Sequence, residues 1–150
     1  MTKDREFTFR PGDVVSRERL HRLFGGQERG GISTPRGHPY IFLFTGARGE
    51  AYGHEHAWEG DIYHYTGEGQ RGDMEFTLRN KALRDHAHHG KRVFLFQERP
   101  DGKQEFVGEM VVRSWRHKTQ KDRSGKERNG IVFELARAGS SAAAPYPDPV

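Results

Sequence analysis

The residues best suited to chemistry gather in two glycine-rich segments. Residues 25–36 read GGQERGGISTPR, and residues 65–73 read YTGEGQRGD. Glycines let backbone N–H groups approach a ligand closely, and the hydroxyl, amide and guanidinium groups between them can bond phosphate oxygens or base edges. The second segment is not a P-loop, because it lacks the Lys-Ser/Thr pair that opens a helix. Both are therefore candidates for contacts with phosphates or bases, and a structural turn or connector is the alternative for each.

A third candidate is a basic stretch at residues 113–128, which reads RSWRHKTQKDRSGKER. It holds seven lysines and arginines against Asp122 and Glu127, whereas the whole chain, with 25 basic and 21 acidic residues, carries only +4. Basic side chains interleaved with Trp115 and His117 suit a phosphate backbone. A solvated hairpin loop would show the same charge, so the stretch alone does not decide between the two.

Nine histidines raise the question of a metal site. His54, His56 and His64 lie close in sequence, but catalytic zinc usually has three ligands at a familiar spacing, and no such order is present. The absence of cysteine excludes disulfides, cysteine-based zinc sites and thiol catalysis. Neither a Gly-x-Ser-x-Gly motif nor an HNH nuclease pattern occurs. We predict a protein that is not an enzyme and has no catalytic residues, metal or cofactor; a histidine–metal enzyme is the alternative from another class.

The elements that must hold these segments are short. With 150 residues the chain suits one domain, which we expect at residues 1–137, followed by a flexible linker or tail at residues 138–150. Apolar runs and alternation predict strands at Glu6–Arg10, Tyr40–Thr45, Asp61–Thr66, Arg92–Gln97, Glu105–Val112 and Gly130–Leu135. One helix is predicted after Ser16 and ends near Phe24, and a second is capped by Asn80 and closed by Gly90.

The order of these elements predicts the fold class. Strands outnumber helices and do not alternate regularly with them. This pattern favours an α+β fold with a mainly antiparallel sheet, curled into a half-barrel, and two or three short surface helices. No apolar run approaches the ~20 residues that a membrane span needs, and the N-terminus is no signal peptide. We therefore expect a cytoplasmic protein with no membrane partner.

Taken in chain order, the motifs resemble those of one known family. They are Gly12-Asp13, the helix and loop RERLHRLFGGQERGGISTP, the strand PYIFLFTG, the loop YTGEGQRGDMEF, the helix RNKALRDH and the strand GIVFEL. Together they look like the sulfur-binding domains of type IV restriction endonucleases that attack phosphorothioate-modified DNA. The resemblance runs from about Gly12 to Leu135. It implies a bacterial DNA-reading module whose partner is duplex DNA carrying phosphorothioate, and an HNH nuclease domain that follows in the native protein.

A wider similarity is to SRA domains, which read 5-methylcytosine. They share the YTG-plus-glycine loop followed by an Asn-x-Ala-Leu helix start, here Asn80, Ala82 and Leu83. SRA domains also carry a tyrosine and acidic stretch before the YTG strand, which helps to form a pocket for a flipped base. Residues 51–61 read AYGHEHAWEGD, with histidines in place of the acidic residues. This difference favours the sulfur reader, and a methylcytosine reader is the second hypothesis.

The chemistry of phosphorothioate predicts the kind of site that a sulfur reader needs. Sulfur is larger and softer than oxygen and accepts hydrogen bonds weakly, so a small apolar cavity should prefer it by about 1–3 kcal/mol, while cations supply most of the affinity. As the resemblance implies, such cavities have proline, alanine and aromatic walls beside an arginine, and we expect this one at Pro35, Arg36, His38, Pro39 and Ala82. The expected contacts to backbone or bases are Ser33, Thr34, Arg36, Gln70, Arg71, Lys81 and Arg84. A flexible clamp is expected at Arg113, Arg116, His117 and Lys118.

Overall fold

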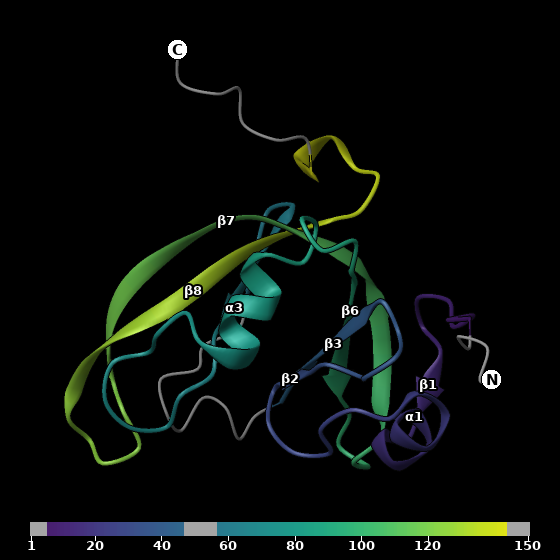
Figure 1. Cartoon of the computed structure of the whole chain (residues 1–150), viewed down its shortest axis with the longest axis horizontal. Coiled ribbons are helices and arrows are strands. Elements are labelled where there is room, and N and C mark those ends of the chain that lie inside the picture. Colours follow the sequence, from purple (N-terminus) through teal and green to yellow (C-terminus); the bar gives the residue numbers. More distant parts are fainter. Residues whose placement is uncertain (1–5, 47–56, 144–150) are drawn as a thin grey trace.

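The computed structural model describes residues 6–46 and 57–143, which form one curled, open sheet with short helices against it (Figure 1). Seven of the eight strands in the described chain lie in the order β2-β3-β6-β7-β8-β5-β4, and the eighth, β1, pairs with the start of β7. β3 and β6 run parallel, and the other pairs are antiparallel. The strands are β1 (Val14–Val15), β2 (Ile32–Ser33), β3 (Tyr40–Thr45), β4 (Ala57–Glu59), β5 (Ile62–Thr66), β6 (Arg92–Glu98), β7 (Gln104–Lys121) and β8 (Glu127–Arg137). The predicted α+β fold with a curled, mainly antiparallel sheet is confirmed.

Strands β7 and β8 give the sheet its curvature. β7 is 18 residues long and pairs with β8 from Met110 to its end. Its register shifts between Val112 and Ser114, and a bulge of this kind bends and twists a strand. In Figure 1 the β7–β8 pair arches over one side of the molecule, and α3 (Leu78–Arg84) lies in the hollow beneath it. The curl therefore leaves a concave face that holds α3 and the loops around it.

Side chains of β3 and β6 alternate between two hydrophobic cores. The core on the α3 side contains Leu83 of that helix together with Ile41, Leu43, Val93 and Leu95. The other core contains Leu20 and Phe24 of α1 (Arg17–Phe24) together with Phe42, Phe44, Phe94 and Phe96. Because both faces of β3 and β6 are covered, their sequences are continuous apolar runs and do not alternate with polar residues.

Helix α1 begins and ends where the sequence predicts. Ser16 Oγ accepts a hydrogen bond from the Arg19 N–H at 3.1 Å, which caps the first turn. Gly25 follows the helix with φ at 83°, a left-handed conformation that glycine adopts without strain, and its N–H donates to the His21 carbonyl.

Unlike α1, three elements of the structure differ from the sequence prediction. Residues 6–10 are not a strand but an irregular segment, because Phe7 turns into the α1-side core and stacks on Phe94 with ring centroids 3.8 Å apart. Asn80 does not cap α3; Thr77 holds the cap position, and Asn80 lies inside the helix. β7 continues nine residues past the predicted end at Val112, to Lys121, so most of the basic stretch lies in paired strands and not in a loop.

β8 ends at Arg137, and a short 3-10 helix, η1 (Ser141–Ala143), follows and packs near β7 and β8. The boundary between domain and tail at residue 137 stays a prediction. Residues 144–150 lie outside the described part, so the flexible tail stays a prediction. Among the described residues, no helix is long and apolar enough to cross a membrane.

Candidate nucleic-acid interface

The two glycine-rich segments meet at one cavity of about 870 Å³, which we call the Tyr65 cavity. Its wall comes from six parts of the chain that are far apart in sequence. They are the start of α1, the first glycine segment, the end of β3, the second glycine segment, the start of α3 and the turn between β6 and β7. Their lining residues are Arg17, Glu28–Gly31, Phe44–Gly46, Tyr65–Gln70, Thr77–Asn80, Glu98, Gly102 and Gln104. The structure thus brings both candidate segments to the same site.

Glu68, in the middle of YTGEGQ, joins the two segments. One of its carboxylate oxygens, Oε1, accepts the Ile32 N–H at 2.7 Å, and the other, Oε2, pairs with Arg79 Nε at 2.8 Å. Burial raises the pKa of Glu68, while the Ile32 N–H and the guanidinium of Arg79 oppose that rise. The carboxylate is therefore held in one place, with acceptor capacity left toward the cavity.

Asn80 fastens the second segment to α3. Its Oδ1 accepts the Glu68 N–H at 2.8 Å, and its Nδ2 donates to the carbonyls of Glu68 and Glu75 at 2.8 and 3.1 Å. A side chain at Gly67 would place its Cβ 2.8 Å from Asn80 Oδ1, so only glycine permits this approach. The asparagine predicted as a helix cap is instead the brace of the loop that lines the cavity.

Tyr65 and Gly31 form a second close contact between the segments. The Tyr65 hydroxyl donates to the Phe44 carbonyl at 3.2 Å, and a Cβ at Gly31 would lie only 2.5 Å from that hydroxyl. Burial raises the pKa of Tyr65 well above its ordinary value, so the hydroxyl keeps its proton and remains a donor.

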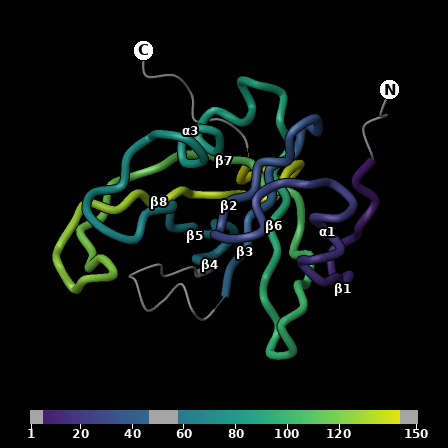
Figure 2. The backbone as a smooth tube through the Cα atoms, turned by 60° about the horizontal axis from the view of Figure 1, so that its bottom comes forward, coloured from purple at the N-terminus to yellow at the C-terminus, as the bar shows by residue number. Residues whose placement is uncertain are grey.

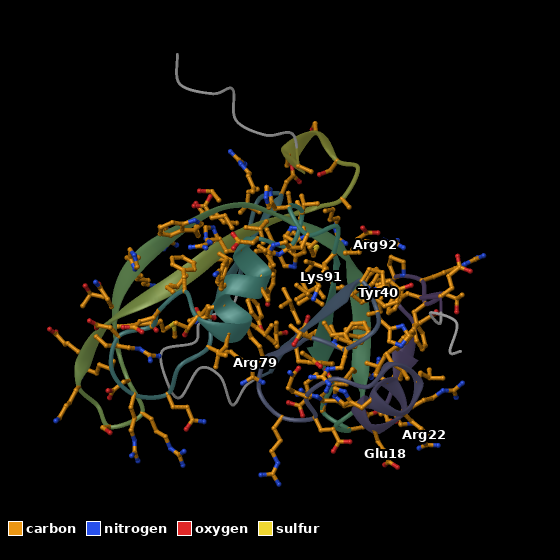
Figure 3. The ribbon with its side chains drawn as sticks, in the orientation of Figure 1. Glu18, Arg22, Tyr40, Arg79, Lys91 and Arg92 are labelled. Atoms are coloured by element: carbon orange, nitrogen blue, oxygen red, sulfur yellow. The ribbon has the colours of Figure 1, made fainter. Side chains whose placement is uncertain are left out.

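Two arginines that the sequence analysis did not single out, Arg17 and Arg79, line the cavity, together with Arg29 and the carboxylates of Glu28, Glu68 and Glu98. Arg17 lies with its guanidinium 3.9 Å from the centre of the Phe44 ring and donates to His21 Nε2 at 2.9 Å. Arg79 belongs to the first turn of α3 and pairs with Glu68 (Figure 3). Burial lowers the pKa of Arg17, partly opposed by Tyr65 and Glu68. Nothing in the sequence pointed to Arg17, and the only signal for Arg79 was its place directly before Asn80.

Leu78, at the start of α3, lines the same cavity and has an unusual conformation. It is 87% exposed, and its φ of 47° is left-handed, the only such value for a residue other than glycine in the described chain. A left-handed conformation costs an ordinary residue about 1–2 kcal/mol. Backbone strain of this kind persists where the surroundings impose it and is common at functional sites.

A second hollow, of about 510 Å³, lies beyond β2, and we call it the proline hollow. Four of the five residues predicted for the sulfur cavity line it: Pro35, Arg36, His38 and Pro39. Thr34 and Lys91 complete its polar rim. Ala82 does not line it, because this residue of α3 packs against the core beneath the sheet.

The predicted DNA contacts are spread over several environments. Ser33 is fully buried in β2, and Arg84 pairs with Asp85 at 2.8 Å, with its guanidinium 4.7 Å from the Phe76 ring centre. Arg71 and Lys81 are exposed near the cavity. Thr34 donates its N–H to Gln27 Oε1 at 2.6 Å, and Gln70 lines the Tyr65 cavity.

The expected flexible clamp is an ordered strand. Arg116, His117 and Lys118 are exposed on β7, but each is paired with β8, and Arg113 lies at the bulge. The ring of His117 packs against those of Trp115 and Phe76, and Arg116 Nη2 lies 3.3 Å from His64 Nδ1. The order arises because Trp115 and His117 alternate with the cations and face the Phe76 side.

The histidine–metal alternative falls mostly outside the described residues, which exclude His54 and His56. His64 pairs with Glu59, its Nε2 lying 3.1 Å from the carboxylate. Within residues 6–46 and 57–143, no three potential ligands gather into a metal site.

Comparison with known proteins places this site in a family context. A family model described as the ScoMcrA-like SRA domain matches residues 11–150. No curated protein sequence matches the chain. The fold is similar to the sulfur-binding and SRA domains of ScoMcrA complexed with phosphorothioated DNA, with a TM-score of 0.71 and 20% identity over 94% of this chain and 43% of that one.

Two further structures share the fold. ScoMcrA, a type IV phosphorothioation-dependent restriction endonuclease, matches with a TM-score of 0.68 and 18% identity over 94% of this chain, which spans only 30% of that protein. The SUVH5 SRA domain in complex with methylated CHH DNA matches with a TM-score of 0.65 and 18% identity, over 91% of this chain and 92% of that one. At these identities the likeness shows an SRA fold.

Proposed function

The chain belongs to the family of ScoMcrA-like SRA domains, and from this premise we propose that it binds duplex DNA and reads a modified base in the Tyr65 cavity. The observation that carries the proposal is the cavity itself, which forms where the two glycine-rich segments meet. A paired base cannot reach the floor of a cavity, so the nucleotide must turn out of the helix. The SUVH5 SRA domain, which shares the fold, is complexed with methylated DNA.

The lining suits a flipped nucleotide. The fixed carboxylate of Glu68 offers an acceptor to the hydrogen-bonding edge of a base. Arg17 and Arg79 bring two guanidinium groups to the same cavity, and guanidinium is well matched to the phosphate that accompanies the nucleotide. Gln70, Arg71 and Lys81 are the sequence-predicted contacts that we retain around this cavity.

Leu78 is an exposed apolar side chain beside the cavity, and a base-flipping domain needs such a side chain to fill the gap that the flipped base leaves. Turning a base out leaves a gap in the stack, and apolar side chains inserted there offset part of the unstacking energy of a few kcal/mol. Leu78 is large, apolar and 87% exposed. We propose that it enters the duplex beside the flipped base.

Four matched duplexes test the proposal: unmodified, carrying one 5-methylcytosine, carrying one phosphorothioate, and carrying both. Dissociation constants are compared at one salt concentration, since DNA affinity depends steeply on salt. We expect the methylated duplex to bind about tenfold tighter than the unmodified one, as one favourable base contact allows. The fluorescence of a 2-aminopurine placed beside the target base should increase on binding, because its neighbour leaves the stack. Equal affinity with no change in fluorescence contradicts base reading.

Recognition of sulfur in the DNA backbone is a second candidate function, and the proline hollow supports it. Apolar surfaces of Pro35 and Pro39 lie there beside the cations of Arg36 and Lys91, which is the combination that sulfur in a phosphate favours. The ScoMcrA domains that share the fold are complexed with phosphorothioated DNA. Arg36→Ala should then weaken binding of the phosphorothioate duplex by about 1–3 kcal/mol. Arg22→Ala, on α1, is the control, and an unchanged dissociation constant for Arg36→Ala removes the hollow from the site.

We further propose that the domain is a targeting module of a bacterial restriction endonuclease, working in the cytoplasm where its DNA lies. Cleavage would then belong to a nuclease domain, such as an HNH domain, elsewhere in the native protein, with residues 138–150 as the link. The length of ScoMcrA, of which this chain spans 30%, supports such an arrangement. Cleavage of modified plasmid by this chain alone with Mg²⁺ would contradict it.

A further inference from the structure

The tip of the β7–β8 hairpin is bonded to the second glycine-rich segment, which lines the Tyr65 cavity. The Arg123 N–H donates to the Gln70 carbonyl at 2.7 Å, and Arg123 Nη1 donates to Gln70 Oε1 at 2.9 Å. Figure 2 shows the hairpin tip at one end of the molecule, beside the loop that leaves β5 and far from α1. Contacts at the tip therefore act directly on a wall of the cavity.

Asp122 is the centre of this connection. Its side chain turns inward, with only 6% of the residue exposed, and Oδ2 accepts the Gly72 N–H at 2.9 Å. The other oxygen, Oδ1, accepts the N–H groups of Ser124 and Lys126 at 2.8 and 3.1 Å, which shapes the hairpin turn itself. One carboxylate thus fixes the tip and the reading loop relative to each other.

Arg128 extends the connection along the loop. It is 4% exposed, and its Nη1 donates to the carbonyls of Gly69 and Gly72. Beside it, the Asn129 N–H donates to Asp73 Oδ1 at 2.7 Å, and the Met74 N–H donates to the Asn129 carbonyl at 2.8 Å. Residues 67–74 have no helix or strand of their own, so the hairpin sets their shape.

The outer surface of the tip is positive because its acidic residue at position 122 faces inward. Lys121, Arg123 and Lys126 are exposed, against one exposed carboxylate, Glu127. Such a surface is complementary to a phosphate backbone, and lysine and arginine contacts with phosphates position a protein on the duplex without reading sequence.

We propose that the hairpin tip binds phosphates of the duplex next to the flipped nucleotide, and that Asp122 is a positioning residue that holds the reading loop to this anchor. The inference rests on the proposed function, since it assigns a task to the loop that lines the Tyr65 cavity. Lys121 and Lys126 supply general affinity, whereas Asp122 supplies discrimination between modified and unmodified DNA.

Two variants separate these roles. Lys121→Ala/Lys126→Ala removes two phosphate contacts, so affinity for every duplex should fall equally and the slope of log K against log salt should shrink by about 1.8. Asp122→Asn keeps an acceptor for the turn but sets an amide against the Gly72 N–H. We expect it to lower the modified-to-unmodified affinity ratio about tenfold while affinity for the unmodified duplex stays unchanged. Arg22→Ala, whose side chain lies on α1 at the far end (Figure 3), is the matched control.

The outcomes distinguish the two proposals. If wild type does not discriminate among the four duplexes, the proposed function fails. If wild type discriminates but the double lysine variant keeps the wild-type salt slope, the hairpin tip does not bind phosphates as proposed. If Asp122→Asn keeps the full affinity ratio, the positioning role is wrong. Should Asp122→Asn unfold, Arg123→Ala replaces it, because its side chain also bonds Gln70. Arg123 is one of the exposed cations of the tip as well, so affinity for every duplex should fall, but the modified-to-unmodified ratio should fall too, whereas the double lysine variant leaves that ratio unchanged.

Discussion

The Tyr65 cavity and the proline hollow lie on either side of β2 and are built in opposite ways. The cavity is closed by hydrogen bonds between segments far apart in sequence, such as Glu68 to Ile32 and Asn80 to Glu68. The hollow is formed by six consecutive residues, 34–39, together with Lys91. A site held by long-range bonds is rigid and depends on the whole fold, whereas a local hollow depends on the conformation of one turn.

This difference bears on what each site can recognise. Polar groups fixed by their neighbours suit a ligand with a defined hydrogen-bonding edge, because they need no rearrangement on binding. Apolar surface beside two cations suits a soft anion whose outline matters more than its hydrogen bonds. Substitutions that affect one site and leave the other intact are therefore the sharpest tests of the contrast.

The largest effect is expected for Asn80→Ala. The residue is 5% exposed and makes three hydrogen bonds to the loop, and its loss leaves a buried N–H and two carbonyls without partners. We expect a loss of about 3 kcal/mol in the free energy of unfolding, measured in urea, and loss of modified-base binding. Lys81→Ala, exposed on the same helix, should change stability by less than about 0.5 kcal/mol. Unimpaired base reading in folded Asn80→Ala would contradict the dependence of the cavity on this brace.

Leu78→Gly should separate stability from recognition. Glycine relieves the left-handed strain at φ 47°, so we expect the free energy of unfolding to rise by about 1 kcal/mol. Without the leucine side chain, the preference for the methylated duplex should fall about tenfold, while binding at the proline hollow stays the same. Leu23→Gly within α1 is the contrasting control, because glycine inside an ordinary helix destabilises. A stabilised variant with full base preference would remove Leu78 from the site.

The smallest effect concerns the pH dependence of stability, through a histidine that lies next to the proline hollow. His86 is buried; its Nε2 accepts the Val112 N–H at 3.0 Å, and its Nδ1 lies 2.8 Å from the carbonyl of Lys91, which lines the hollow. Burial lowers the pKa of His86 below its ordinary 6.5, so the unfolded chain takes up the proton first as pH falls. Stability should be constant above about pH 7.5 and decrease by about 1 kcal/mol between pH 6.5 and 5.

Urea unfolding at several pH values checks this expectation. Burial also lowers the pKa of His21, so part of the decrease belongs to that residue. His86→Gln should reduce the pH dependence, whereas His88→Gln, at an exposed position, should leave it unchanged. A wild-type profile that is flat down to pH 5 would show that His86 is not held neutral.

Sequence reasoning succeeded where structure is local. The Ser16 cap and the buried run of β3 depend on near neighbours, and both were predicted. Four of the five residues predicted for the sulfur cavity are also neighbours in the chain and line one hollow, but their role stays a prediction. It failed where distant segments decide. Ser33 reads as a loop donor, but its pairing with Phe42 buries it. Arg17 and Arg79 enter the cavity only because α1 and α3 converge there, which no spacing in the chain reveals.

The parallel pairing of β3 with β6 has a consequence for variation in this family. The two strands are neighbours that run in the same direction, so the chain leaves β3 at Thr45 and re-enters at the opposite end of the pair, where Arg92 lies beside Tyr40. The described residues of this crossover supply β4 and β5 to the sheet and α3 to the concave face, so the crossover is a part of the fold and not a free loop. One continuous stretch of the gene therefore carries both an edge of the sheet and part of the wall of the Tyr65 cavity, and a change in its length would alter the two together.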